Sequence, residues 1–198
     1  MSTKPVSRGP AHFERLYEAS PDPWRFRESG YEQAKYRNTI AALGDRRFRS
    51  GFEVGCSIGV LTRLLAPFCA RLLAVDMVAR PLAAARDTCA DQPWVRFAQM
   101  AVPQEWPDET FDLIVLSEVL YFLSPADIAA VADHVVGSLD DGGMVVLVNW
   151  RGTSDDPCTG DEAATLFISH THDRLTVCRG SREAGYRLDV LTGPPRTG

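Results

Sequence analysis

The sequence predicts an α/β protein with a doubly wound, mostly parallel sheet of seven strands that closes with an antiparallel hairpin. Three observations predict this class. Short apolar runs alternate with helix-like segments across residues 51–148. A glycine turn separates the first run from the helix after it. Two final runs, residues 174–178 and 186–191, stand close enough in the chain to pair as a hairpin.

Three of the expected helices have a clear start. Ser29, Ser124 and Thr159 are each followed three residues later by an acid, which is the pattern of a capped helix N-terminus. The first of these helices is expected to end near Leu43, with Gly44 as its stop. The last is expected to be short, ending at about residue 169. The other expected elements are strands at 51–54, 71–75, 94–98, 111–116 and 144–148, and helices at 59–69 and 81–90.

The run at residues 111–116 is apolar enough to be a central strand covered on both faces. In open sheets of this kind, ligands bind at the carboxyl ends of the parallel strands. Function is therefore expected in the segments that follow the first four strands.

Length and charge indicate one globular domain. The chain has 198 residues and a formal net charge of -5, which disfavours a nucleic-acid-binding surface. We expect a flexible N-terminal segment at residues 1–21, one domain at 22–192 whose first part, 22–44, covers the cofactor, and a tail at 193–198. The N-terminus lacks the apolar region of a signal peptide, and no run reaches membrane-spanning length.

Cysteines and histidines give no sign of a disulfide framework or a metal site. The five cysteines are odd in number and dispersed, which indicates reduced thiols and a cytoplasmic protein. His170 and His172 stand two residues apart, but no cysteine or carboxylate cluster accompanies them. We therefore expect no metal.

Two acids flank the glycine turn. Glu53 precedes Gly55 at the end of the first strand, and Asp76 ends the second. The dinucleotide pattern of three glycines is incomplete, because Gly55 and Gly59 stand four residues apart, so a nicotinamide cofactor is disfavoured. An acid in such a central strand needs a cation or several N–H donors. The ammonium and sulfonium groups of S-adenosylmethionine meet this need, although a carboxylate bonded to its own glycine loop is the alternative for Glu53.

These residues carry a family resemblance. The segment from Glu53 to Gly59, Asp76 and the segment from Phe111 to Tyr121 resemble the Rossmann-like class I S-adenosylmethionine-dependent methyltransferases. More narrowly, Asp22-Pro-Trp24, Tyr31-Glu-Gln-Ala-Lys35-Tyr36 and Ser117-Glu-Val-Leu-Tyr-Phe-Leu123 resemble the nodulation protein S group. That group N-methylates the free amino sugar at the end of a chitooligosaccharide. The resemblance runs from about Asp22 to Leu191.

The resemblance implies a role for each of several residues. The methionine end of the cofactor is expected at Glu53, Gly55, Cys56 and Gly59. The ribose is expected at Asp76, and the adenine at Met77, Met100 and Ala101. Ser117 is also expected in the cofactor site, and Trp24 and Lys35 are expected to close over it. Lys35 is expected to point toward the cofactor's carboxylate, and Trp24 is as well explained by core packing. The family usually has an aspartate where Ala101 stands, so a backbone group or Gln99 would have to hold the adenine amino group.

The acceptor is expected beside Glu118, just after the fourth strand, as the group that binds or deprotonates it. Tyr121 is a second candidate. A solvated carboxylate and a packing role are the alternatives for these two residues. The implied partner is a small-molecule or oligosaccharide acceptor, with no nucleic acid, no membrane and no obligate protein partner. An O-methyltransferase and a non-catalytic domain that binds S-adenosylmethionine remain alternatives to N-methylation.

Overall fold

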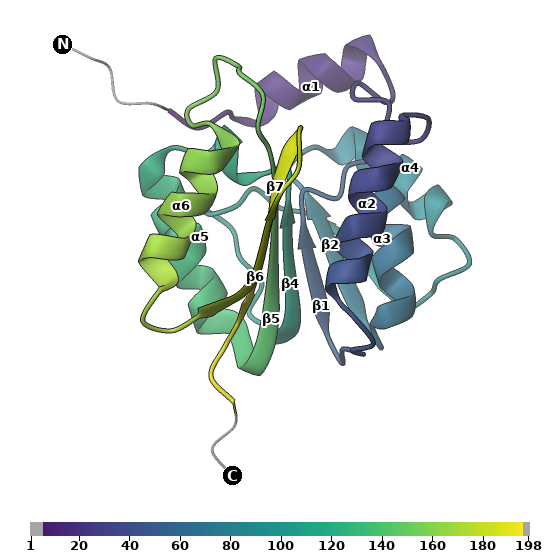
Figure 1. Ribbon diagram of the computed structural model, residues 1–198. Helices are drawn as coiled ribbons and strands as arrows, with labels where there is room; N and C mark the ends of the chain where they lie inside the picture. Colours follow the sequence, from purple (N-terminus) through teal and green to yellow (C-terminus); the bar gives the residue numbers. More distant parts are fainter. Residues whose placement is uncertain (1–5, 196–198) are drawn as a thin grey trace, which may run out of the picture.

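The computed structural model describes residues 6–195, and its centre is one seven-stranded sheet in the order β3-β2-β1-β4-β5-β7-β6 (Figure 1). Neighbours among β1 to β5 pair in parallel, whereas β7 is antiparallel to both β5 and β6. The predicted class, a doubly wound and mostly parallel sheet with a C-terminal antiparallel hairpin, is confirmed. The strands are β1 (Gly51–Val54), β2 (Leu72–Asp76), β3 (Val95–Gln99), β4 (Phe111–Ser117), β5 (Leu139–Trp150), β6 (Thr176–Arg182) and β7 (Tyr186–Thr192).

Helices cover both faces of the sheet. Figure 1 shows α2, α3 and α4 on one side and α5 and α6 on the other, with α1 across the end of the sheet. The helices are α1 (Pro10–Ala19), α2 (Gly30–Ala42), α3 (Val60–Leu65), α4 (Ala79–Thr88), α5 (Pro125–Ser138) and α6 (Gly160–Thr171), with short 3-10 helices η1 (Ala66–Phe68) and η2 (Leu120–Phe122). None of the helices within residues 6–195 combines the length and the apolar character needed to cross a bilayer.

The three predicted helix starts are confirmed by their hydrogen bonds. Ser29 and Ser124 each accept from the backbone N–H three residues later, and Thr159 with Glu162 forms a reciprocal capping box. Each cap satisfies a backbone donor that the first helical turn leaves unpaired. Local side-chain chemistry therefore sets where these helices begin.

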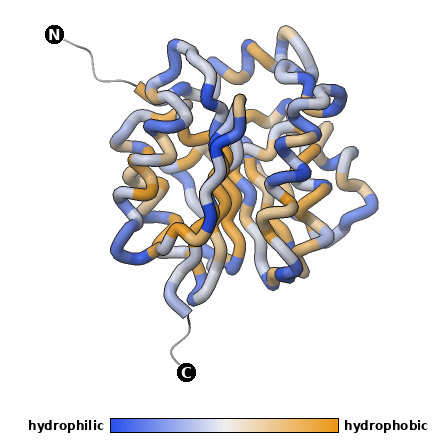
Figure 2. Tube along the Cα trace, viewed as in Figure 1, coloured by the Kyte–Doolittle hydropathy of each residue, from blue (hydrophilic) through white to orange (hydrophobic). Residues whose placement is uncertain are grey.

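The central strands are the most buried part of the chain. Leu113, Ile114, Val115 and Leu116 of β4 are each 0% exposed, and Figure 2 shows hydrophobic residues concentrated along the inner strands. Alternate residues of β4 pack into two clusters, one beneath α5 and α6 and the other beneath α2 and α3. Because apolar layers cover both faces, the edge where these strands end is the place where polar groups can gather.

Three expectations for the chain boundaries are corrected. The segment expected to be flexible at residues 1–21 contains α1, because Pro10 begins a helix whose Tyr17 is buried. Residues 1–5 and 196–198 lie outside the described residues, but Gly193 and Pro194 of the expected tail form backbone hydrogen bonds with Gly143 and Gly142. The fifth strand, expected at residues 144–148, begins earlier, at Leu139.

Gly59 fixes the packing of α3 against α4. Its φ of +79° lies in the left-handed region that favours glycine, and a Cβ there would stand 2.9 Å from Cα of Ala85. The backbone of Ala85 belongs to α4 and cannot yield without moving that helix. Gly59 is therefore a packing residue.

We expect Gly59→Ala to lower the free energy of unfolding by at least about 2 kcal/mol, since left-handed backbone and steric overlap both oppose it. Gly137→Ala is the matched control, because Gly137 lies in α5 and an added Cβ would meet no atom within 4 Å. Urea unfolding measures both, and the control should be neutral or slightly stabilising. Equal stability of the two variants would contradict this packing role.

Candidate active site

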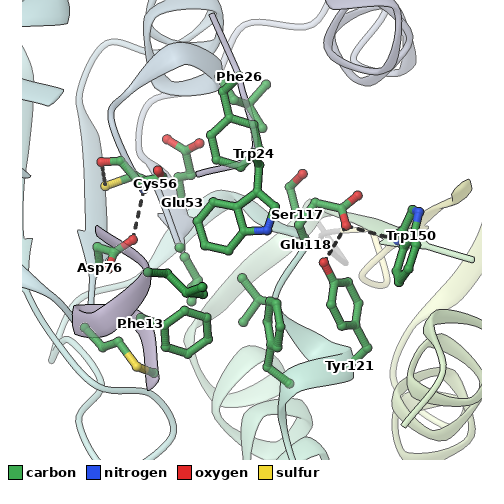
Figure 3. Close-up of a pocket in the computed structure, with 18 of the residues that line it drawn as sticks. Phe13, Trp24, Phe26, Glu53, Cys56, Asp76, Ser117, Glu118, Tyr121 and Trp150 are labelled. Atoms are coloured by element: carbon green, nitrogen blue, oxygen red, sulfur yellow. Dashed lines mark hydrogen bonds between the residues drawn. The ribbon is translucent and has the colours of Figure 1, made fainter. Parts of the chain in front are cut away.

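A cavity of about 510 Å³ opens at the carboxyl ends of β1, β2 and β4. Figure 3 shows its two polar ends: Glu53 and Asp76 lie at one side, Glu118 and Tyr121 at the other, and Trp24 lies between them. The parallel strands bring these side chains together because their carboxyl ends meet at one edge of the sheet. We call the two sides the Glu53 end and the Glu118 end.

Glu53 is buried with an unused acceptor. Its side chain points from β1 into the cavity, it is 2% exposed, and no group within residues 6–195 donates a hydrogen bond to its Oε2 atom. Burial raises the pKa of Glu53 to about 7. A buried carboxylate in this state is a good partner for a cation.

Asp76 ends β2 and is held by the glycine turn. Its two oxygens accept hydrogen bonds from the backbone N–H groups of Ser57 and Val78, at 3.0 and 2.9 Å. Burial nevertheless raises its pKa to about 6. Gly55, at φ +77°, turns the chain between Glu53 and Asp76. Cys56 follows Gly55, and its burial raises the pKa of its thiol. Asp76 keeps free acceptor positions toward the cavity.

Helix α1 and the segment after it cover the Glu53 end with aromatic rings. Tyr17 donates to the Ser57 hydroxyl at 2.5 Å and meets Trp24 edge to face, with ring centroids 5.7 Å apart. Trp24 in turn stacks on Phe26. The sequence analysis missed α1; the signal was Pro10 followed by apolar residues at helical spacing, of which Phe13 and Tyr17 line the cavity.

The chain before α1 ties this cover to the Glu118 end. Arg8 donates its backbone N–H to the carbonyl of Phe122, and its guanidinium pairs with Asp155 and Asp156, each at 3.0 Å. Phe13 of α1 also meets Phe122 edge to face, with ring centroids 5.0 Å apart. Asp155 and Asp156, in the loop after β5, line the cavity as well.

Glu118 is the most heavily bonded side chain of the site. Its Oε1 accepts from Lys35 Nζ at 2.9 Å, and its Oε2 accepts from the Tyr121 hydroxyl at 2.8 Å and the Trp150 backbone N–H at 3.1 Å. Its backbone has φ +60°, an unusual value for a side-chain-bearing residue. Backbone strain of this kind is typical of functional sites, where a side chain is held in one direction.

Lys35 lines the cavity, and its ammonium lies between Glu32 and Glu118, at 2.8 and 2.9 Å. These two partners were not expected from the sequence, and the contact with a cofactor carboxylate stays a prediction. The Lys35 Nζ also lies 5.3 Å from the centroid of the Tyr31 ring. Glu118 is accordingly a paired carboxylate and not a solvated one.

The structure gathers most of the predicted site residues around one cavity. Those that line it are Trp24, Lys35, Glu53, Gly55, Cys56, Asp76, Met77, Met100, Ser117, Glu118 and Tyr121. The two that do not are Gly59, which packs against α4, and Ala101, whose N–H and carbonyl are both bonded to Glu105. Gln99, considered as a substitute at the adenine, donates its amide to the Met77 carbonyl.

No cluster of three or more metal-binding side chains occurs among residues 6–195. The polar groups that line the cavity include carboxylates, a lysine, a histidine and hydroxyls, which suit an organic ligand with positive charge and hydroxyl groups.

The sheet order, the helices on both faces and the cavity at the strand ends together define a Rossmann-like class I methyltransferase fold. The family model for nodulation protein S (NodS) matches residues 12–153. The chain belongs to the nodulation protein S family.

Several relatives carry the same name. The chain is 35% identical over 133 residues to nodulation protein S of Sinorhizobium fredii strain NGR234, covering 65% of this chain and 61% of the relative. It is 31% identical to that of Rhizobium tropici, covering 67% and 57%. The matches thus span less than two thirds of these relatives' length.

A crystal structure of N-methyltransferase NodS from Bradyrhizobium japonicum WM9 in complex with S-adenosyl-L-homocysteine superposes with a TM-score of 0.80 at 24% identity. The match covers 93% of this chain and 98% of that one. At this identity the likeness establishes the fold.

The buried Glu53 predicts a pH-dependent stability. Its pKa rises from 4.5 to about 7 on folding, so the folded state binds more protons than the unfolded state between these values. The free energy of unfolding of the ligand-free protein should fall across that range, by up to about 3 kcal/mol from this group. Glu53→Gln removes the effect: it should match the native protein at pH 4.5 and be more stable at pH 8. Urea unfolding at both pH values measures this.

The matched control is Glu109→Gln, a partly exposed glutamate paired with Arg96, which should show no such pH-dependent gain. If Glu53→Gln is no more stable than the native protein at pH 8, other groups in the folded protein already offset the cost of burying the Glu53 charge.

Proposed function

We propose that the protein is an S-adenosylmethionine-dependent methyltransferase acting on a small polar acceptor, in the first place an amino-sugar nitrogen such as that of a chitooligosaccharide. The observation that carries the proposal is the buried Glu53 carboxylate, without a donor on Oε2 among the described residues, in the same cavity as the paired Glu118 carboxylate. Family membership supports it, as does the structural relative that holds S-adenosyl-L-homocysteine.

The residues at the Glu53 end fit this cofactor. Glu53 supplies the negative charge that the cofactor's ammonium requires, and Asp76 has free lone pairs for two ribose hydroxyls. Met77 and Met100 offer polarisable apolar surface for the adenine, and Trp24 covers the site. When bound, S-adenosylmethionine supplies a methyl group on a sulfonium, already activated for transfer.

The chain then has to align the acceptor, exclude water and leave the acceptor atom with a free lone pair. Glu118 can receive the proton or bind the polar group of the acceptor, because a carboxylate offers about four acceptor sites. Trp150 and Tyr121 line the same end and offer aromatic faces to a sugar ring. The acidic Asp155 and Asp156 favour an acceptor with donor groups or positive charge.

Two alternatives lead to different results. In O-methylation the acceptor is a hydroxyl, which the same Glu118 could deprotonate. A non-catalytic domain would bind the cofactor without turnover, and the missing acid at Ala101 motivates that alternative. Incubation with labelled S-adenosylmethionine and a panel of amino sugars, phenols and carboxylic acids separates them: turnover of any acceptor excludes the non-catalytic domain, and the acceptor identifies the atom.

We further propose that the protein acts in the cytoplasm with no obligate protein partner. The five cysteines are free, and four of them are buried, which suits a reducing compartment.

Isothermal titration should show micromolar binding of S-adenosylhomocysteine at pH 8. Binding should be about tenfold weaker at pH 6, because Glu53 must first release a proton whose pKa is about 7. Glu53→Gln and Asp76→Ala should each weaken binding at least tenfold. Glu53→Gln should also remove most of the pH dependence and leave the smaller part that comes from Asp76, whose pKa is about 6. Glu109→Gln is the control. Absence of binding by folded native protein would remove the assignment as a methyltransferase.

Glu118→Gln should lower turnover on the order of a hundredfold while leaving the affinity for S-adenosylhomocysteine within about threefold. The amide keeps the shape but loses the negative charge at the Glu118 end. Steady-state kinetics and titration on the same sample measure both. Equal loss of turnover and affinity would place Glu118 in the cofactor site instead.

A further inference from the structure

Glu32, Lys35 and Glu118 form an ion triad between a helix and the end of the central strand. Lys35 Nζ lies 2.8 Å from Glu32 Oε2 and 2.9 Å from Glu118 Oε1. The three side chains are 10%, 2% and 14% exposed, respectively, so the triad is largely removed from water. Glu32 and Lys35 belong to α2, and Glu118 follows β4, so the contact joins two elements far apart in the sequence.

The charges of the triad do not cancel. One ammonium stands between two carboxylates, which leaves one negative charge uncompensated beside the cavity. Replacing buried ionic groups with hydrophobic residues of similar volume is often neutral or stabilising, because desolvation offsets most of the attraction within buried ion pairs. Stability alone therefore does not account for the arrangement.

The bonds around Glu118 define its direction. Lys35 holds Oε1 from α2, whereas the Tyr121 hydroxyl and the Trp150 N–H hold Oε2 from η2 and β5. The remaining lone pairs are the ones available to a ligand in the cavity. Without Lys35, Oε1 would lose its donor, and only the two hydrogen bonds at Oε2 would hold the carboxylate in place.

We propose that Lys35 is a positioning residue for the acceptor: it fixes the Glu118 carboxylate, and Glu32 keeps its ammonium at the Glu118 end of the cavity, away from the cofactor. The inference rests on the proposed methyl transfer and assigns Lys35 a different role from the cofactor contact expected from the sequence. The covering helix α2 thus sets the geometry of acceptor binding.

Removing Lys35 alone is a poor test, because it leaves two buried carboxylates without a counter-ion and can unfold the protein. The double variant Glu32→Gln/Lys35→Met avoids this. It keeps the single negative charge of the native triad and removes the ammonium that orients Glu118. The comparison variant is Glu32→Gln alone, because it keeps the ion pair between Lys35 and Glu118.

The double variant is expected to fold, to bind S-adenosylhomocysteine within about threefold of the native affinity, and to lose turnover by at least tenfold relative to Glu32→Gln. Urea unfolding, titration and steady-state kinetics with an amino-sugar acceptor give the three values. Turnover equal to that of Glu32→Gln would overturn the proposal, since charge balance alone would then be sufficient. A loss of cofactor affinity above tenfold would also overturn it, and would restore the role at the cofactor carboxylate.

A second readout needs no turnover and separates this proposal from the proposed function. The Trp150 backbone N–H donates to Glu118 Oε2, so its hydrogen exchange, followed by NMR in the full chain, reports whether Glu118 stays in place. Exchange should be at least tenfold faster in the double variant than in Glu32→Gln. Unchanged exchange means that Lys35 does not position Glu118, whatever reaction the protein catalyses. Faster exchange without methylation by the native protein would instead refute the proposed function alone.

Discussion

The energetic constraint at the centre of this molecule is a carboxylate buried at the tip of an inner strand. Glu53 lies near the end of β1 and is 2% exposed, and burial raises its pKa to about 7. Water would satisfy the side chain if the site were open. The glycine turn, the aromatic cover and the second acid at Asp76 all make sense around a ligand that brings the missing positive charge. The fold thus gives up some stability at this point, which is typical of a functional site.

The same edge of the sheet holds carboxylates in two kinds of surroundings. Burial raises the pKa values of Glu53 and Asp76, and in Asp76 it outweighs the hydrogen bonds from Ser57 and Val78. Glu118 instead has an ammonium and two further donors. Carboxylates in such different surroundings can divide binding and proton transfer between them. Their separation across one cavity suits a cofactor at one end and an acceptor at the other.

Local patterns predicted the sheet and most of the cavity, because alternation of strands and helices determines which segments meet at the carboxyl edge. Caps such as Ser29 and Thr159 are encoded within four residues and were predicted correctly. What the sequence did not reveal depends on contacts remote in sequence. The packing of Gly59 on Ala85 places the start of α3 against α4, and the Glu118 partner of Lys35 lies 83 residues away. The ligand contacts expected for Gly59 and Lys35 stay predictions. Helix α1 is short and is stabilised by packing over the cavity, so its sequence alone predicts a flexible terminus.

Helix α1 touches both halves of the cavity. Tyr17 bonds to Ser57 at the Glu53 end, while Phe13 and the preceding Arg8 engage Phe122 and the acidic loop at the Glu118 end. In the proposed methyltransferase, a ligand that moves α1 at one end of the cavity would therefore change contacts at the other end. Thermodynamic linkage would make that influence reciprocal, so cofactor and acceptor would change each other's affinity by the same factor. The ten residues of α1 offer a physical route for such coupling.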